Sequence, residues 1–182
     1  MFKQLNKKRV GKIKMRKNDL RYIKTEKIIK DTYLNLKKKY HSEIKVSELC
    51  KVAMINKSTF YAHYETMDYL HQQLSSEIIE NMIHDLLNID KIMNDLESFV
   101  ISIINTIQDN IEIITLMFGD DKNQLVSYVE KCLLSFFFKQ KELKGKEKEF
   151  IFAIGGAANL LMSNQNKETI KSAIKLIHKT IQ

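Results

Sequence analysis

The chain has 182 residues, of which 44% are hydrophobic, and it carries a formal net charge of +8 at pH 7. This length and apolar content suit one globular domain, or two small ones that share a core. There is no proline and there are only five glycines, which favours an all-helical protein. Cys50 and Cys132 stand apart without a CxxC pair, which argues against a disulfide framework and against a zinc site.

Basic residues crowd the N-terminal end. Residues 1–30 hold twelve Lys and Arg against Asp19 and Glu26, a net of +10, so residues 31–182 sum to −2. The twelve are Lys3, Lys7, Lys8, Arg9, Lys12, Lys14, Arg16, Lys17, Arg21, Lys24, Lys27 and Lys30. Cations near phosphates release counterions, so residues 1–20 are predicted to form a basic arm along a DNA backbone or in a minor groove. A solvated, disordered tail is the alternative, and the lack of an apolar stripe disfavours membrane docking.

From residue 21 onward, apolar residues recur at spacings of three and four, which predicts an all-α protein. Residues 45–70 are expected to form two short helices joined by a tight turn. Ser47 is the expected N-cap of the first helix, Met54 and Ile55 make the turn, and Asn56 caps the second. Phe60 is expected to fill the groove between the two helices.

The second of these short helices is expected to turn a polar face outward, made of Lys57, Ser58, Tyr61 and His63. A short helix of this kind fits the major groove, which is about 12 Å wide, where such groups meet phosphates and base edges. An ordinary helical hairpin with a solvated polar face is the alternative.

From Thr25 to about Leu74 the chain resembles the N-terminal domain of the tetracycline-repressor (TetR) family. The resemblance is carried by Thr59-Phe60-Tyr61-Ala62-His63-Tyr64, followed by the acidic and apolar Glu65-Thr66-Met67-Asp68-Tyr69-Leu70. It implies that Lys57, Ser58 and Tyr61 face the groove. It also implies that Lys45, Ser47, Thr59 and His63 lie near the phosphate backbone.

Two positions depart from the family's pattern. Met54 stands where the family usually has a glycine in the turn, so a left-handed residue is in doubt and a different backbone path is expected. Met67 stands where the family usually has a lysine, so a phosphate contact is missing there. Lys57 or the basic arm could supply it instead.

The rest of the chain is expected to be helical, and the longest apolar stretch, thirteen residues at 150–162, falls short of the roughly 20 that a membrane span needs. The first expected helix carries Leu70, Leu74, Ile78, Met82, Ile83 and Leu86 on one side. The expected ranges are 68–87, 93–108, 111–118, 122–143, 146–163 and 167–181. Gly119, Asn110 and Gly145 mark the breaks.

In the TetR family the last two helices form the dimer interface and the middle helices enclose a ligand cavity. The resemblance therefore implies a homodimer through residues 147–182, where an apolar stripe is formed by Ile170, Ala173, Ile174, Ile177 and Ile181. Packing within one chain is the alternative cover for that stripe. A small apolar ligand would be lined by Phe99, Ile103, Met117, Tyr128, Phe152 and Asn159, although such clusters are more often plain core.

The sequence thus predicts an all-α protein with a basic arm (1–20), a three-helix helix-turn-helix DNA-binding head (21–68) and a helical ligand-binding and dimerisation domain (69–182). The expected function is a cytoplasmic, ligand-responsive repressor that binds palindromic double-stranded DNA. An activator of the same fold, or a basic protein binding an acidic partner or membrane surface, is the alternative. The sequence contains no Walker loop, HExxH or GxSxG motif, so we expect no enzyme, cofactor or metal.

Overall fold

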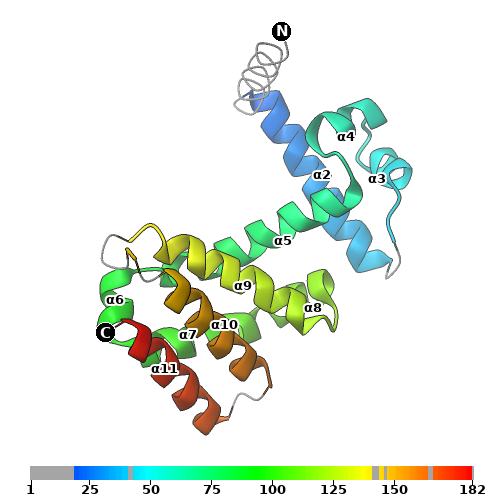
Figure 1. Ribbon diagram of the computed structural model, residues 1–182. Helices are drawn as coiled ribbons and strands as arrows, with labels where there is room; N and C mark the ends of the chain where they lie inside the picture. The colour runs from blue at the N-terminus through cyan, green and yellow to red at the C-terminus, as the bar shows by residue number, and fades with distance from the viewer. Residues whose placement is uncertain (1–18, 41–42, 141–143, 146, 164–165, 182) are drawn as a thin grey trace. The chain divides into compact units, whose positions relative to one another are not determined.

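The computed structural model describes residues 19–40, 43–140, 144–145, 147–163 and 166–181, and these residues contain helices and no strand (Figure 1). The predicted all-α class is therefore confirmed for this part of the chain. The basic arm predicted at residues 1–20 lies almost wholly outside it. No single described helix is long and apolar enough to cross a membrane, although Leu96–Asp109 and Ile111–Phe118 pass that test as a pair bent by 74°.

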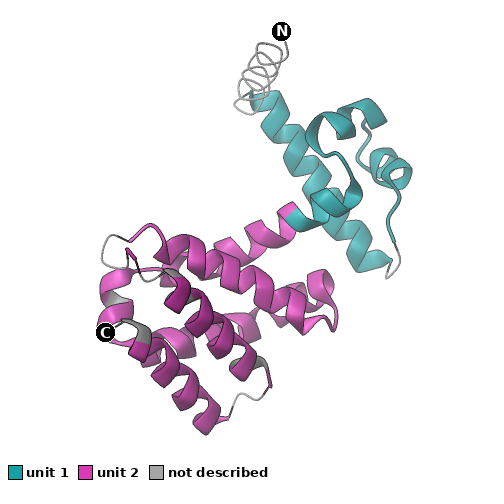
Figure 2. Cartoon of the chain, viewed as in Figure 1, with its two compact units in different colours: residues 1–72 teal, residues 73–182 magenta. Residues whose placement is uncertain are grey.

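The chain divides into two compact units, residues 1–72 and 73–182 (Figure 2). Unit 1 contains α2 (Leu20–Lys39), α3 (Val46–Val52), α4 (Lys57–His63) and the start of α5 (Met67–Ile83). Unit 2 contains the rest of α5, a 3₁₀ turn η1 (His84–Leu86), α6 (Ile89–Asn94), α7 (Leu96–Asp109), α8 (Ile111–Phe118), α9 (Lys122–Phe137), α10 (Glu147–Ser163) and α11 (Lys167–Ile181). The boundary between the units thus falls inside α5.

In unit 1, α2 is the longest element and packs against α3, which in turn packs against α4. Asp19 caps α2, accepting a hydrogen bond from the backbone N–H of Arg21 at 2.9 Å. Ile29, Tyr33 and Leu36 are buried and recur at spacings of four and three, so one face of α2 supplies the core.

The start of α3 differs from the prediction. Its N-cap is Lys45, whose carbonyl accepts from the N–H groups of Glu48 and Leu49, while Ser47 is an exposed residue of the first turn. Ile44 and Leu49 are both buried and occupy the two positions of a hydrophobic staple, one before the cap and one in the first full turn. Burial of this pair sets where the helix begins, and the preference of serine for a cap position does not.

Three predicted helix boundaries in unit 2 were also wrong. The helix expected at 68–87 stops at Ile83 and tightens into the η1 turn, where the N–H of Leu87 bonds to the carbonyl of His84. The helix expected at 93–108 begins only at Leu96, where Asp95 accepts from the backbone N–H of Ser98 at 3.0 Å and caps the start, and the short α6 before it was not predicted. The helix expected at 122–143 ends at Phe137.

The core of unit 2 is built by α7, α9, α10 and α11, with α10 packed on α9 and α11, and α11 packed on α7. Gly156 allows the close approach of α10 and α11, since a methyl group at its α-carbon would meet Leu176 Cδ2 at 2.9 Å. Between α8 and α9, Gly119 has φ +56° and ψ −130°, a conformation that is strained for any other residue. The helical breaks expected at Gly119 and Asn110 both occur.

Candidate nucleic-acid interface

Helix α4 is anchored by two aromatic side chains on its inner face. Phe60 is fully buried and Tyr64, the residue that ends the helix, is 4% exposed. The hydroxyl of Tyr64 donates to Glu26 Oε1 at 3.3 Å, and Glu26 also pairs with Lys30 at 3.1 Å. The packing of Phe60 and the hydrogen bond of Tyr64 to α2 together fix both the position and the rotation of α4.

The opposite face of α4 lies in solvent. Lys57, Ser58, Tyr61 and Ala62 are exposed, and Tyr61 keeps 55% of its surface open while its ring lies edge-on to Phe60. Three of the residues predicted to face a groove, Lys57, Ser58 and Tyr61, therefore share one accessible surface. Of the residues predicted near a phosphate backbone, Lys45 and Ser47 are exposed at the start of α3, and Thr59 is half-buried in α4.

The turn between α3 and α4 keeps a left-handed residue, so the different backbone path expected from the missing glycine was wrong. Met54 has φ +52°. The N–H of Ile55 bonds to the carbonyl of Cys50 at 3.0 Å, and the N–H of Met54 bonds to that of Lys51 at 3.4 Å. These two bonds are those of a Schellman motif, which requires a left-handed residue just past the helix end. The side chain of Met54 is 92% exposed, so packing of this side chain does not offset the backbone strain.

His63 does not point outward as predicted. Its ring stacks on that of Tyr22 in α2, with centroids 3.8 Å apart and an interplanar angle of 26°. Its Nδ1 atom is buried and has no hydrogen-bond partner among the described residues. Burial lowers the pKa of His63, against an opposing effect of Glu26, so the ring is neutral near pH 7. The periodicity of α4 explains the difference, since residue 63 falls on the same side as the buried residues 60 and 64.

A second histidine ties α5 to α2 within unit 1. The hydroxyl of Tyr33 lies 3.0 Å from His71 Nδ1. Burial, assisted by Asp68, raises the pKa of Tyr33 to about 12, and burial followed by Lys37 lowers the pKa of His71. The phenol therefore stays protonated and shares a hydrogen bond with a neutral imidazole, whose tautomer decides which group donates.

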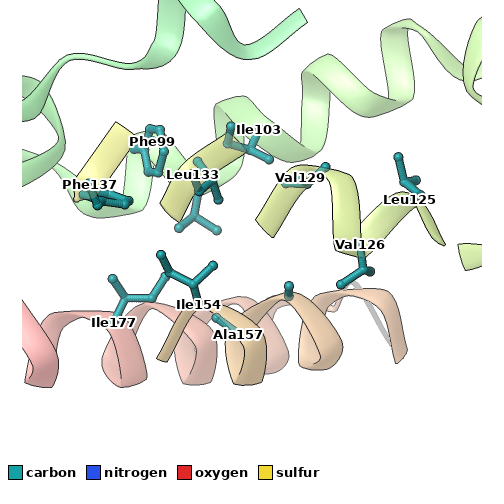
Figure 3. A pocket seen from close by; sticks show the side chains of 12 residues that line it. Phe99, Ile103, Leu125, Val126, Val129, Leu133, Phe137, Ile154, Ala157 and Ile177 are labelled. Carbon is teal, nitrogen blue, oxygen red and sulfur yellow. The ribbon is translucent and has the colours of Figure 1, made fainter. Parts of the chain in front are cut away.

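Unit 2 contains an apolar cavity of about 80 Å³ between α7, α9, α10 and α11 (Figure 3). Its walls include Phe99 and Ile103, as predicted, together with residues that the prediction missed. Those are Val100, Leu125, Val126, Val129, Leu133, Phe137, Ile154, Ala157, Ala158 and Ile177. The five of these that lie on α9 could have been predicted from the apolar repeat at 125, 126, 129, 133 and 137.

The other four residues predicted to line a ligand cavity lie elsewhere. Met117 is buried outside this cavity, and Tyr128 packs on Phe118 with ring centroids 5.5 Å apart. Phe152 is 75% exposed, because it lies about 200° around α10 from the lining residue Ile154. Asn159 is exposed, and its amide donates to the carbonyl of Gly155 at 2.8 Å.

Helix α10 exposes large apolar side chains, as do Ile111 and Phe138 elsewhere in unit 2, at 55% and 47%. Ile151, Phe152 and Leu160 are 50%, 75% and 39% exposed. By contrast, Ala173 and Ile177 of the predicted α11 stripe are buried within the unit. Intramolecular packing therefore covers that part of the stripe.

No group of three or more His, Cys, Asp or Glu side chains gathers as metal ligands within the described ranges. Comparison with known proteins finds no matching family model, no similar curated protein and no similar solved structure.

Proposed function

We propose that this chain is a sequence-specific DNA-binding transcriptional regulator similar to the TetR family, with unit 1 as a helix-turn-helix head. The observation that carries the proposal is the exposed polar surface of α4, with Lys57, Ser58 and Tyr61 on one face of a helix held rigidly from behind. In helix-turn-helix proteins such a second helix lies in the major groove. A left-handed residue in the turn, at Met54, matches the backbone that the resemblance implies.

The distribution of charge also supports the assignment of unit 1 as the DNA-binding unit. Residues 1–72 contain 18 Lys and Arg against 7 Asp and Glu, a net of +11, whereas residues 73–182 contain 12 against 15, a net of −3. A basic unit attracts the phosphate backbone and an acidic one does not, so the field orients the approach of DNA towards unit 1.

A homodimer follows from the need for two heads on one site. Heads of a two-fold dimer read half-sites roughly 34 Å apart, which is one turn of DNA. The outer face of α10, with Ile151, Phe152 and Leu160, is the apolar surface that a second copy would cover. We assign the larger share of the dimer contact to α10, because Ala173 and Ile177 of α11 are already buried within unit 2.

Ligand response is assigned to unit 2. The cavity next to Phe99 and Ile103 would take a small apolar molecule, because its whole lining is apolar. Helix α5 runs from unit 1 into unit 2, so a ligand that prefers one packing of unit 2 would shift the population of head positions. Repression relieved by the ligand is the expectation that the resemblance carries.

The decisive experiment is selection of bound sequences from a random duplex pool with the purified full-length chain at about 150 mM salt. We expect one palindrome to be enriched. On that site, Lys57→Ala and Tyr61→Ala are each expected to weaken binding by about 1–3 kcal/mol. Lys139→Ala, which removes an exposed cation from unit 2, is the matched control and should bind like the parent.

Two results would contradict the proposal. The first is equal affinity for all duplexes, which would mean that the basic residues bind charge without reading bases. The second is unchanged specific affinity in both α4 variants, which would mean that another surface reads the DNA. The sign of regulation is then measured by transcription in vitro from a template that carries the selected palindrome.

A further inference from the structure

Five residues of α4 and its N-cap position are exposed and therefore accessible to a DNA base. They are Asn56, Lys57, Ser58, Tyr61 and Ala62. The helix itself, KSTFYAH, carries no Arg, Gln, Asp or Glu. Arg or Lys pairs with guanine, and Asp or Glu accept from cytosine, so Lys57 is the one exposed side chain of this helix that suits a G·C pair.

Asn56 is a cap by position but not by hydrogen bonding. Its backbone is extended, at φ −77° and ψ 152°, and its side chain makes no cap hydrogen bond. Its carbonyl alone starts the helix, accepting from the N–H groups of Thr59 and Phe60 at 2.9 and 3.1 Å. The side chain is exposed, so its donor and its acceptor both remain open to a partner.

An amide with both groups open matches one base edge in the major groove. Adenine presents the N7 acceptor beside the N6 amino donor, and asparagine binds this pair in a bidentate manner. The neighbouring Lys57 can only donate, and the hydroxyl of Ser58 does not discriminate among bases.

The exposed face of α4 offers a methyl group near the end of the helix. Ala62 is exposed and lies one helical turn after Ser58, next to Tyr61. An alanine methyl in the groove packs against the C5-methyl of thymine, a group that no other DNA base carries.

We propose that Asn56 reads an adenine and Ala62 a thymine methyl, so that each head specifies A·T pairs at these two positions. This inference rests on the proposed function, because it names the bases that the same surface would recognise. It also gives Asn56 a specificity role in addition to the capping role that its sequence position suggests.

The test of Asn56 uses Asn56→Ser on the selected palindrome. The Asn56 side chain makes no cap hydrogen bond that serine would lose, so the variant is expected to keep the fold, which its melting temperature verifies. It cannot make the bidentate contact, so we expect roughly 10-fold to 100-fold weaker binding to the A·T site. We also expect little change in binding to a site with G·C at that position. Unchanged discrimination between the two sites would overturn the assignment of Asn56.

The test of Ala62 removes only the thymine methyl, by replacing each dT of the site in turn with dU. At one position per half-site we expect roughly fourfold weaker binding, which corresponds to about 0.8 kcal/mol for one buried carbon. The ratio of dT to dU affinity should fall to one in Ala62→Gly, and this ratio does not depend on how stable the variant is. A ratio that stays the same in Ala62→Gly would overturn the assignment. Failure of the selection itself would instead refute the proposed function, before any variant is made.

Discussion

The helices inside unit 1 and the helices inside unit 2 are joined by different kinds of interaction. In unit 1, directional contacts join the helices: the Tyr64–Glu26 and Tyr33–His71 hydrogen bonds and the Tyr22–His63 ring stack. In the centre of unit 2, α7, α9, α10 and α11 meet through aliphatic and phenylalanine side chains around an unfilled cavity.

The contrast shows which unit tolerates a change of shape. Hydrogen bonds and ring stacks weaken steeply with angle, so they fix α4 in one orientation, as a reading surface requires. Dispersion contacts are non-directional and the lining of a cavity lacks some of them, so a small apolar molecule in unit 2 would supply contacts that are missing there. Under the proposed function, unit 1 would supply the DNA specificity and unit 2 the ligand response.

The largest effect should come from removing the anchor of unit 1. Phe60→Ala deletes a fully buried ring and is expected to cost about 3–5 kcal/mol of unfolding free energy. Tyrosine fluorescence in a urea titration reports mainly on unit 1, because six of the seven tyrosines lie before residue 73. Tyr61→Ala, at a 55% exposed neighbour, should change stability by no more than about 0.5 kcal/mol. Equal losses in the two variants would refute the assignment of the inner and outer faces of α4.

A comparable deletion in unit 2 should behave differently. Leu133→Ala enlarges the cavity and is expected to cost about 2–5 kcal/mol, with the smaller values if the walls collapse. Because apolar cavities of roughly 150 Å³ bind benzene, saturating benzene should raise the melting temperature of this variant more than that of the parent. No ligand-dependent shift in calorimetry would mean that unit 2 closes the space and offers no site.

The stability of unit 1 should also depend on pH. The pKa values of His63 and His71 are lowered by burial, so the folded unit 1 holds both rings neutral, while the unfolded chain protonates near 6.5. As the pH falls through 6.5, the unfolded state takes up protons first, and the stability of unit 1 declines until the pH passes below the folded pKa values.

This decline is measured by tyrosine fluorescence in urea titrations between pH 8 and 5 (roughly the range in which histidine titrates). His63→Phe keeps a ring to stack on Tyr22 but cannot bind a proton, so its stability should depend less on pH than that of the parent. A parent protein whose stability is constant over this range would show that neither histidine is held neutral.

The smallest effect concerns the turn. Met54→Gly removes the strain of a left-handed residue, roughly 1–2 kcal/mol, but adds about 0.5–1 kcal/mol of chain entropy to the unfolded state. The net expectation is a gain of about 0.5 kcal/mol in unfolding free energy. Met54→Ala keeps the strain and should show no gain. A loss of stability in the glycine variant would mean that the methionine side chain contributes a contact of its own.

Much of this molecule could be predicted from local patterns. The α3–turn–α4 arrangement, the burial of Phe60 and the exposure of Lys57, Ser58 and Tyr61 follow from helical periodicity, which one short segment contains in full. Positions that depend on a partner from another helix were predicted less well. His63 was expected outside because its stacking partner, Tyr22, lies 41 residues earlier in the chain.

The same limit applies to the cavity. Phe99 and Ile103 were identified, while Phe152 and Asn159 were placed on the wrong side of α10. An apolar residue in a helix predicts burial but not which neighbour buries it, since the hydrophobic effect has no direction. Helix breaks at Asp95 and after Ile83 were missed for a related reason, because a cap competes with a continuing helix only where packing favours the bend.

The sequence by itself determined the helical class, the concentration of positive charge in residues 1–72 and the polar face of α4, because each depends on composition or on the 3.6-residue period alone. Only the tertiary structure decided that Met54 is left-handed, that His63 turns inward and that α10 exposes its apolar face. Each of these depends on side chains or hydrogen bonds from elsewhere in the fold, and such long-range contacts can override local preference.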